Sequence, residues 1–408
     1  MEPEELAEHM TIACRVNDNG RTALILACRN IQSDIALLLA DSMNKVDHVD
    51  EVGDTALMWA CSNGMTDVAK NLIPKMDKID HVSRNGGTAL ILACSSGMID
   101  VAKDLISKMD KVDHVEDKGN TALILACSKE MTDVANDLIT KMDKVDHAND
   151  RGDTALMWAC RNGMTNVAKN LITKMDKIDH VNQSGYTALI TACLKEMTDV
   201  ARDLISKMNK VDHVNKNNNT ALILACSNGM TDVANDLISK MDKVDHVNNS
   251  DNTALILACS KNMTDVAHNL ISKMDKVDHV NNNDNTALIL ACSKNMTDVA
   301  HNLITKMDKV DHVNKKGYTA LKWAYEKNMT DVIQKLHSKM KNEKNRPDKI
   351  KISSDIIDKI TQTLGYRPNK DSLSVHTVNG ETFILANACD NERIRKKPKS
   401  YTEVVNME

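Results

Sequence analysis

The sequence predicts an all-α solenoid of ten closely similar repeats, each built from a helix, a turn, a second helix and a loop. Two observations lead to this fold class. The tripeptide Thr-Ala-Leu recurs every 33 residues without slippage, and two short helical patterns follow it in each repeat. The tripeptide begins at Thr22, Thr55, Thr88, Thr121, Thr154, Thr187, Thr220, Thr253, Thr286 and Thr319.

The amino-terminal residues 1–16 are predicted to form a half-repeat that closes this end of the stack. Leu6 and Met10 lie in the same repeat phase as Leu72 and Met76, and terminal repeats of solenoids are commonly atypical. This end is acidic and lacks a basic segment followed by an apolar run, so we expect no secretory signal. No stretch approaches the roughly 18 apolar residues of a membrane span, so we expect no membrane partner.

The eighth repeat shows why each unit should contain two short helices. In its first half Leu255 and Ala258 fall at helical spacing, and Thr253 is placed to cap the helix with its side-chain oxygen. The second half opens at Thr264 and Asp265, a further cap with an acid at the positive helix end. The apolar residues of the second pattern are Val266, Ala267, Leu270, Ile271 and Met274.

Each predicted helix has roughly ten residues or fewer, which is too short to be stable alone. Only stacking against similar neighbours can bury a continuous core. Since aromatic residues make up 2% of the chain, Ala, Leu, Ile, Val and Met must fill that core. We therefore expect one stacked array over residues 17–340.

Residues 341–408 are predicted to be a small carboxy-terminal tail, because the repeat phase is lost there. Isoleucines at helical spacing predict one amphipathic helix over 352–364. Residues 375–385 fit either a hairpin around an Asn-Gly pair or a decayed repeat, and both alternatives stay open.

The repeated framework has the form D/N-x-x-G-x-T-A-L-x-x-A-C-x-x-G-x-x-D-V-A-x-x-L-I. It resembles the ankyrin-repeat family, whose pattern of loop and paired helices it matches over the whole array. Three departures stand out: Ala56 and its equivalents replace a proline, Met58 or Ile replaces a histidine that braces the turn, and Met109 and its equivalents replace a glycine cap. We therefore expect the helix ends to differ in detail. The near-identical repeats, rich in Asn, Lys and Ile, also resemble ankyrin arrays of giant and other large DNA viruses.

Cysteine occupies one position of the first helix in nine repeats, beside the framework Ala. Packed helices lie roughly 8 to 10 Å apart, whereas a disulfide needs Cα atoms within about 7 Å and zinc needs sulfur at about 2.3 Å. We therefore predict buried, unpaired thiols, no metal or other cofactor, and a reducing, intracellular and cytoplasmic location. These residues are Cys28, Cys61, Cys94, Cys127, Cys160, Cys193, Cys226, Cys259 and Cys292.

Histidine recurs in an Asp-His pair before the loop, which raises the alternatives of a metal ladder or a catalytic dyad. The spacing between repeats disfavours the ladder, and no nucleophile is placed consistently near these residues. We predict structural loop histidines. They are His48, His81, His114, His147, His180, His213, His246, His279 and His312.

Three tryptophans, Trp59, Trp158 and Trp323, share one repeat position that is mostly Leu elsewhere. We predict that they fill the core, and the alternative is an exposed aromatic anchor for a partner.

The loop just before each Thr varies when the chain is compared with itself, while the framework is nearly constant. A rigid solenoid with varied loops along one edge offers an extended face to a protein, and the resemblance to ankyrin proteins assigns such tips to ligand contact. Neutral drift at solvated positions is the alternative. Because later tips are Asn-rich, we expect repeats 2 to 6 to contribute most. The predicted partner-binding residues are Glu51, Val52, Asp54, Arg84, Asn85, Asp117, Lys118, Asp150, Arg151, Asp153, Gln183, Ser184, Tyr186, Lys216, Lys315 and Tyr318.

These features predict a protein-binding scaffold or adaptor, with a partner whose identity the residues leave open. A net charge of -5 and a pI near 6.3 disfavour nucleic acid. The alternative is a substrate adaptor for a ubiquitin ligase recruited through the tail, an arrangement known among large DNA viruses. The tail carries no phosphate loop, no metal-spaced Cys and His, and no nucleophile with a base, so we predict no enzyme and no catalytic residues. A basic run at 393–399, opening with Arg393, resembles a nuclear-import signal and would add nuclear entry.

Overall fold

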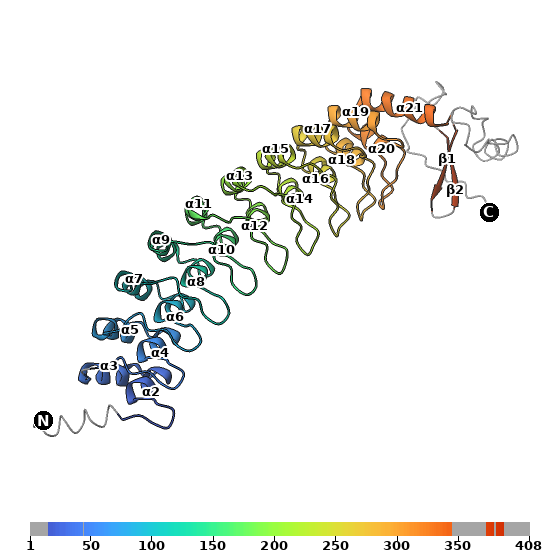
Figure 1. Ribbon diagram of the computed structural model, residues 1–408. Helices are drawn as coiled ribbons and strands as arrows, with labels where there is room; N and C mark the ends of the chain where they lie inside the picture. Colours follow the sequence, from blue (N-terminus) through green and yellow to red (C-terminus); the bar gives the residue numbers. More distant parts are fainter. Residues whose placement is uncertain (1–14, 44, 345–372, 379–380, 387–408) are drawn as a thin grey trace, which may run out of the picture. The chain divides into compact units, whose positions relative to one another are not determined.

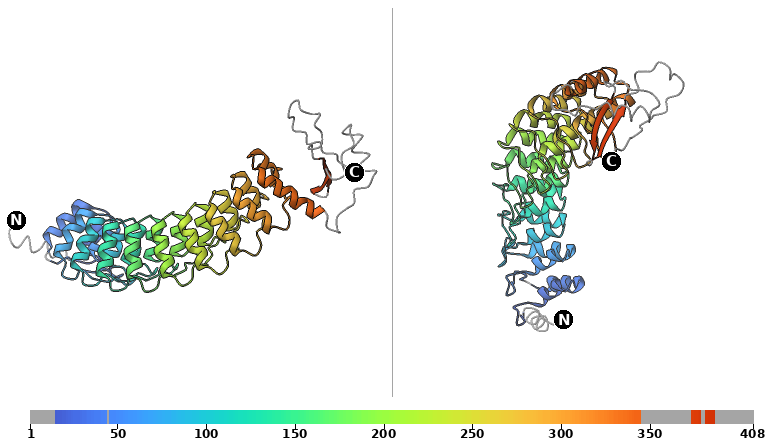
Figure 2. Two further views of the ribbon diagram at one scale, coloured as in Figure 1. Left: turned by 90° about the horizontal axis from the view of Figure 1, so that it is seen from above. Right: turned by 90° about the vertical axis from the view of Figure 1, so that its right-hand side faces the viewer.

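The predicted all-α array of helix pairs is confirmed. Contacts divide the chain into two compact parts, Met1–Lys339 and Met340–Glu408. In the first part ten helix pairs follow one another in chain order (Figures 1 and 2). The computed structural model describes residues 15–43, 45–344, 373–378 and 381–386.

Several expectations fall on residues outside these ranges. The half-repeat expected over 1–16 lies almost entirely outside the described residues. The tail helix expected over 352–364, on which the ubiquitin-ligase hypothesis depends, and the basic run at 393–399 lie wholly outside them.

We number the repeats 1 to 10 from the Thr that opens each one. The first helices are α2 Ala23–Arg29, α4 Ala56–Ser62, α6 Ala89–Ser95, α8 Ala122–Ser128, α10 Ala155–Arg161, α12 Ala188–Leu194, α14 Ala221–Ser227, α16 Ala254–Ser260, α18 Ala287–Ser293 and α20 Ala320–Glu326. The second helices are α3 Ser33–Ser42, α5 Thr66–Leu72, α7 Ile99–Lys108, α9 Thr132–Lys141, α11 Thr165–Lys174, α13 Thr198–Lys207, α15 Thr231–Lys240, α17 Thr264–Lys273, α19 Thr297–Lys306 and α21 Thr330–Lys344. A 3₁₀ turn, η1 Ile73–Lys75, continues α5 and contains the proline of repeat 2.

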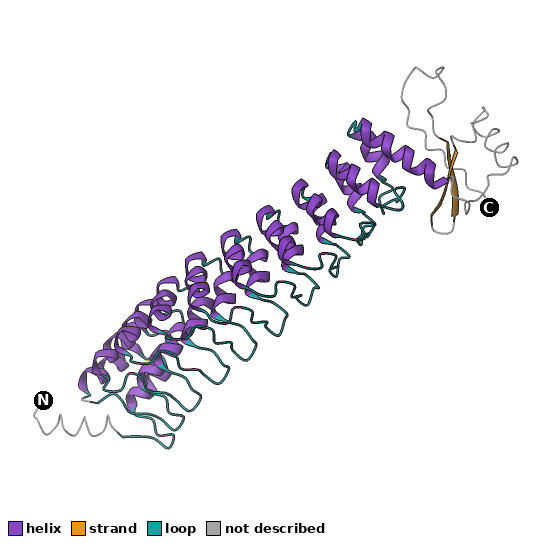
Figure 3. Cartoon of the chain, turned by 45° about the horizontal axis from the view of Figure 1, so that its top comes forward, coloured by secondary structure: helices purple, strands orange, loops and turns teal. Residues whose placement is uncertain are grey.

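In repeats 1 to 9 each first helix packs against its own second helix, and the first helices of successive repeats pack against one another up to α20. The long loops of all repeats project from the same side of this part (Figure 3). The core is formed by apolar faces of both helices, and in repeat 8 Leu255, Ile256, Leu270 and Met274 are all buried. Since no single repeat encloses these side chains, the core exists only through stacking.

The first helices begin as predicted. In repeat 8 the Thr253 hydroxyl accepts a hydrogen bond from the Ile256 amide at 3.3 Å, and every opening Thr makes the same cap. These threonines are almost all buried, so the bond satisfies an amide that water cannot reach.

The prediction that Thr264 caps the second helix is wrong. Thr264 is the first helical residue of α17, and the cap position is occupied by Met263, which makes no side-chain cap bond. Met263 is buried in the core. The start of this helix is therefore set by anchoring an apolar side chain, while Asp265 lies in the first turn as expected.

The second helices end without the left-handed glycine cap of the family, as expected. The cap residue of α15 is Met241 in an extended conformation, and the helix carbonyl groups are reached instead from the next repeat. Lys273 Nζ donates to the Ile238 carbonyl oxygen at 2.6 Å. Lysines at this position therefore close the preceding helix and place positive charge at its negative end. The equivalent donors are Lys75, Lys141, Lys174, Lys207, Lys240 and Lys306.

In the second part the structure describes an antiparallel pair of strands, β1 Leu373–Val378 and β2 Glu381–Ala386. Val378 pairs with Glu381, and Leu373 pairs with Ala386. Of the two open alternatives for this segment, the hairpin is therefore the one observed. The alternation of apolar and polar residues in LSVHTV suits a strand.

Replacing Lys273 by Met should loosen the end of α15, because Ile238 would lose its charged donor. We expect a cost of about 1 kcal/mol, reduced by partial solvent exposure, and about five-fold faster amide exchange in the last turn of α15. Lys276→Met, an exposed lysine three residues later, is the matched control. Equal exchange in both variants would contradict the capping role.

Gly119 and Gly97 both adopt positive φ, +75° and +73°, but differ in the space around them. A Cβ at Gly119 would lie 2.7 Å from the backbone nitrogen of Asp150 in the next loop, whereas at Gly97 nothing lies within 4 Å. We expect Gly97→Ala to cost about 1 kcal/mol from the left-handed conformation alone. Gly119→Ala should lower the urea midpoint at least twice as far, and similar shifts would show that the loops are not tightly packed.

Candidate functional site

The loops are joined to one another by backbone hydrogen bonds at their tips. Gln183 N in the repeat-5 loop donates to Arg151 O at 2.9 Å, and Lys216 N in the next loop donates to Ser184 O at 3.1 Å. The same bond links every pair of successive loops up to Lys315. Since both neighbours hold each tip, the loops form one continuous strip along the array.

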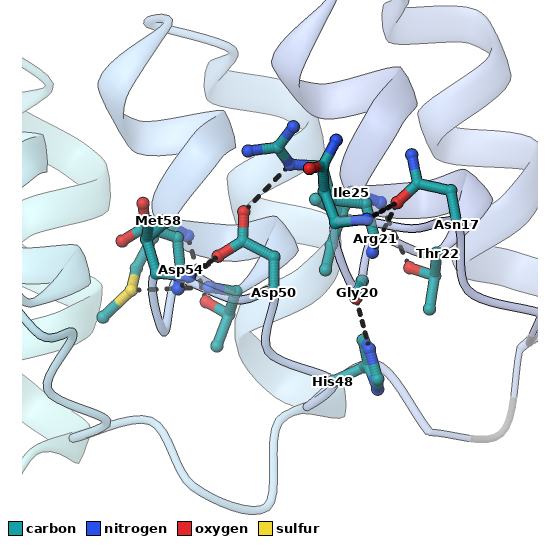
Figure 4. Close-up of polar contacts among 12 residues, drawn as sticks. Asn17, Gly20, Arg21, Thr22, Ile25, His48, Asp50, Asp54 and Met58 are labelled. Carbon is teal, nitrogen blue, oxygen red and sulfur yellow. Dashed lines mark hydrogen bonds and ion pairs between the residues drawn. The ribbon is translucent and has the colours of Figure 1, made fainter.

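Histidine side chains make a second link between loops. His48 Nε2 lies 2.7 Å from the carbonyl oxygen of Gly20 in the preceding loop (Figure 4). A carbonyl oxygen only accepts, so the Nε2–H of the ring donates. The predicted structural role is confirmed for His48 and for five equivalents, His81, His147, His246, His279 and His312.

Two carboxylates in the repeat-1 loop have opposite electrostatic environments. Asp50 accepts from the amides of Val52 and Asp54 and pairs with Arg21 at 3.1 Å (Figure 4). Burial would raise the pKa of Asp50, but these donors outweigh it and the pKa is lowered. Asp54, a predicted binding residue, has a raised pKa because of burial and the negative charge of Asp50.

Asparagine takes the place of Asp50 in most later loops, and the sequence did not indicate what it does. Asn182 Oδ1 accepts from the amides of Ser184 and Tyr186, and its Nδ2 donates to Asp153 Oδ1 at 2.7 Å. This residue therefore shapes its own loop and ties it to the preceding one. The same inter-loop bond is made by Asn149, Asn248, Asn281 and Asn314.

None of the sixteen predicted partner-binding residues is buried, and we call this set the loop edge. The exposed members are Glu51, Val52, Arg84, Asn85, Asp117, Lys118, Asp150, Arg151, Gln183, Lys216 and Lys315. The half-buried members are Asp54, Asp153, Ser184, Tyr186 and Tyr318.

The prediction that the tryptophans fill the core is wrong. Trp59, Trp158 and Trp323 are half-buried, on the side of the first helices that faces the loops. Arg29 lies over the Trp59 ring at 5.5 Å, and Arg161 lies over the Trp158 ring at 5.2 Å. The first helices are apolar on nearly every side, so their periodicity could not distinguish a core position from one at its margin.

A pocket of about 470 Å³ lies between the loops of repeats 4 and 5 and the first helices of repeats 5 and 6. Its lining joins five members of the loop edge to the first helices of both repeats. The contribution of the helices was not predicted, although the repeats differ there too, with Thr191 in place of Leu or Trp. The edge residues are Arg151, Asp153, Gln183, Ser184 and Tyr186, and the helix side adds Met157, Trp158, Arg161, Thr191, Leu194 and Lys195.

A protein-family model described as ankyrin repeats in three copies matches the chain in overlapping segments that reach from residue 4 to residue 348. The matched segments are 4–83, 34–116, 57–148, 123–213, 199–279 and 255–348. The chain belongs to the ankyrin-repeat family. Ankyrin repeats generally act as protein–protein interaction scaffolds, and proteins built from them are typically not enzymes. A comparison with curated proteins finds no match.

The nine repeated cysteines of the ankyrin array are all buried and unpaired. Burial raises the pKa of Cys94 and Cys160 from 9.0 to about 12, so their thiols stay protonated at neutral pH. Across the described residues, no three His, Cys, Asp or Glu side chains gather in a group that could bind a metal ion. No described helix is long and apolar enough to cross a membrane.

The thiols should make the ankyrin array lose stability at alkaline pH. A group whose pKa is raised on folding contributes its full stabilisation of the native state at any pH below its pKa in the unfolded chain. For these thiols the pKa rises from about 9 in the unfolded chain to about 12 in the folded one, so the stabilisation is lost as the pH rises through this range. Each thiol contributes a slope of up to about 1.36 kcal/mol per pH unit. Urea titrations between pH 8 and 10.5 should therefore show a shallower decline for the Cys94→Ala/Cys160→Ala variant, and an unchanged slope would exclude this contribution.

Proposed function

We propose that this ankyrin array is a scaffold or adaptor that binds a protein partner along the loop edge and the adjoining face of the first helices. The main support is that the residues which differ most between repeats lie on the loops and the adjoining first helices, where they are exposed or half-buried. Function is commonly placed on loops held by a rigid framework.

Rigidity of the edge supports this proposal. Because backbone and side-chain bonds hold each loop against its neighbours, a partner would meet a preformed surface and little conformational freedom would be lost on binding. The edge also carries charge that differs from loop to loop, with Glu51 and Asp54 in repeat 1, Arg84 in repeat 2 and Lys315 in repeat 9. A partner with the complementary pattern of charge would be oriented by it.

The opposite side of the array offers less variety. Second helices of adjacent repeats are connected there by ion pairs, such as Lys70 with Asp100 at 2.7 Å and Lys103 with Asp133 at 2.7 Å. These charges already have partners within the chain. The buried, unpaired thiols support an intracellular, reducing location, and the net charge of -5 favours a protein over nucleic acid.

The test uses the full chain as bait in affinity capture, with quantitative mass spectrometry of the proteins retained. In the edge variant Arg84, Asp117, Gln183 and Lys216 are changed together to Ala, and we expect specific partners to fall at least ten-fold, because these exposed tips would supply the contacts.

The matched control changes Lys70, Lys103, Lys169 and Arg202 on the opposite side to Ala. It alters as many polar side chains, all of them on the surface of the second helices, and partner capture should stay at the wild-type level. Loss of the same partners from the control but not from the edge variant would place binding on the second helices and refute the proposal.

A further inference from the structure

The pocket between repeats 5 and 6 is lined by a side chain that is unusually small for its repeat position. At the position of Thr191 the other repeats carry Leu or Trp. In repeat 10 the equivalent residue, Trp323, stacks on Tyr318 with ring centroids 4.8 Å apart. The repeat-5 loop carries the matching tyrosine, Tyr186, but the hydroxyl of Thr191 in repeat 6 turns back to its own helix and donates to Thr187 O at 2.9 Å. Among the described residues, Tyr186 stacks on no other ring.

The empty volume is bordered by apolar and aromatic surface. Trp158 lies on the repeat-5 side and Tyr186 on the loop side, and Leu194, 42% exposed, contributes from the end of α12. An exposed leucine beside two half-buried rings is an arrangement that a large apolar side chain of a partner can cover. The equivalent position of Leu194 is Ser in six other repeats.

The rim of the pocket is cationic. Among the lining residues, Arg151, Arg161 and Lys195 stand against one carboxylate, Asp153, which gives the lining a charge of +2, while Asp150 lies next to Arg151 in the chain and outside the lining. Asp153 already accepts a hydrogen bond from Asn182 at 2.7 Å. The three cations would therefore favour an acidic ligand.

We propose that this pocket binds an acidic peptide segment of a partner protein, with one large apolar or aromatic side chain inserted between Trp158 and Tyr186. The inference rests on the proposed scaffold function and names the partner's chemistry at one site. Its volume of about 470 Å³ suits such a side chain with flanking residues, whereas the pocket beside Trp59 has about 150 Å³.

A peptide fits these features better than a nucleic acid. Phosphate backbone binding needs a basic track that extends over many residues, whereas the cations of the loop edge are interrupted by carboxylates such as Asp117, Asp150 and Asp153. Preferential binding of a nucleic acid would therefore contradict the proposal.

The full-length protein is used to select from a phage-displayed library of random twelve-residue peptides, and the most enriched peptide is then measured by fluorescence polarisation. We expect enriched peptides that combine several acidic residues with an aromatic or large aliphatic residue. Thr191→Trp should weaken binding at least ten-fold, because it rebuilds the stack of repeat 10 inside the pocket. Arg161→Ser and Lys195→Asn, which introduce residues found at these positions in other repeats, should each weaken binding several-fold.

Two variants outside the pocket are matched controls, Arg29→Ser and Lys261→Asn, which make the same changes in repeats 1 and 8. Both should bind as wild type, and circular dichroism with thermal unfolding checks that the pocket variants are folded. Enriched peptides without excess acidic charge, wild-type affinity in the folded Thr191→Trp variant, or failure to enrich any peptide would each overturn the proposal. So would tighter binding of a ten-nucleotide oligo(dT) than of the peptide, with loss in Arg161→Ser.

An edge variant with Arg84, Asp117 and Lys216 changed to Ala, which leaves the pocket residue Gln183 in place, separates this inference from the scaffold function. If peptides lose affinity for the edge variant yet bind the Thr191→Trp variant normally, the scaffold proposal stands and the pocket proposal is refuted. If the edge variant still captures the partners and the peptides require Thr191, the pocket proposal stands and binding along the extended edge is refuted.

Discussion

Every repeat of this ankyrin array depends on its neighbour for hydrogen bonds that it cannot make itself. A lysine of one repeat reaches the final carbonyl groups of the preceding second helix, as Lys273 does for Ile238. A histidine reaches back to the preceding loop, as His48 does for Gly20. In an isolated repeat these polar groups and the apolar helix faces would remain exposed, so the smallest stable structure is a stack.

This dependence explains why the framework hardly varies while one edge does. A residue that bonds to the next repeat has to match that repeat, and ten similar repeats then share the same Thr, Lys, His and Asn. At the loop tips the backbone makes the connection between successive loops. Tip side chains only add to this connection, as those of Gln183 and Lys315 do with hydrogen bonds to the preceding loop. They are therefore free to differ, and a partner can be recognised there without any change in packing.

The pocket between repeats 5 and 6 shows how a repeat architecture produces an individual site. One substitution, Thr191 in place of a larger residue, leaves space beside Tyr186 and Trp158 while the hydrogen bonds of the framework stay intact. Charged side chains from one loop and two helices then surround that space. Residues that depart from the repeat pattern determine which ligand the pocket would bind, and the repeat framework only positions these residues.

The sequence alone determined the helix pairs, their order, the buried cysteines and the position of the variable edge, because strict periodicity forces equivalent residues into equivalent surroundings. It also predicted the cap at Thr253. It could not place Trp158, since a helix that is apolar on almost every side gives no signal of which side meets solvent. Nor could it show that Met263 rather than Thr264 occupies the helix cap, or that Arg151, Arg161 and Lys195 converge on one pocket. Those outcomes depend on contacts between residues about one repeat apart, and only the tertiary structure decides how closely successive repeats approach.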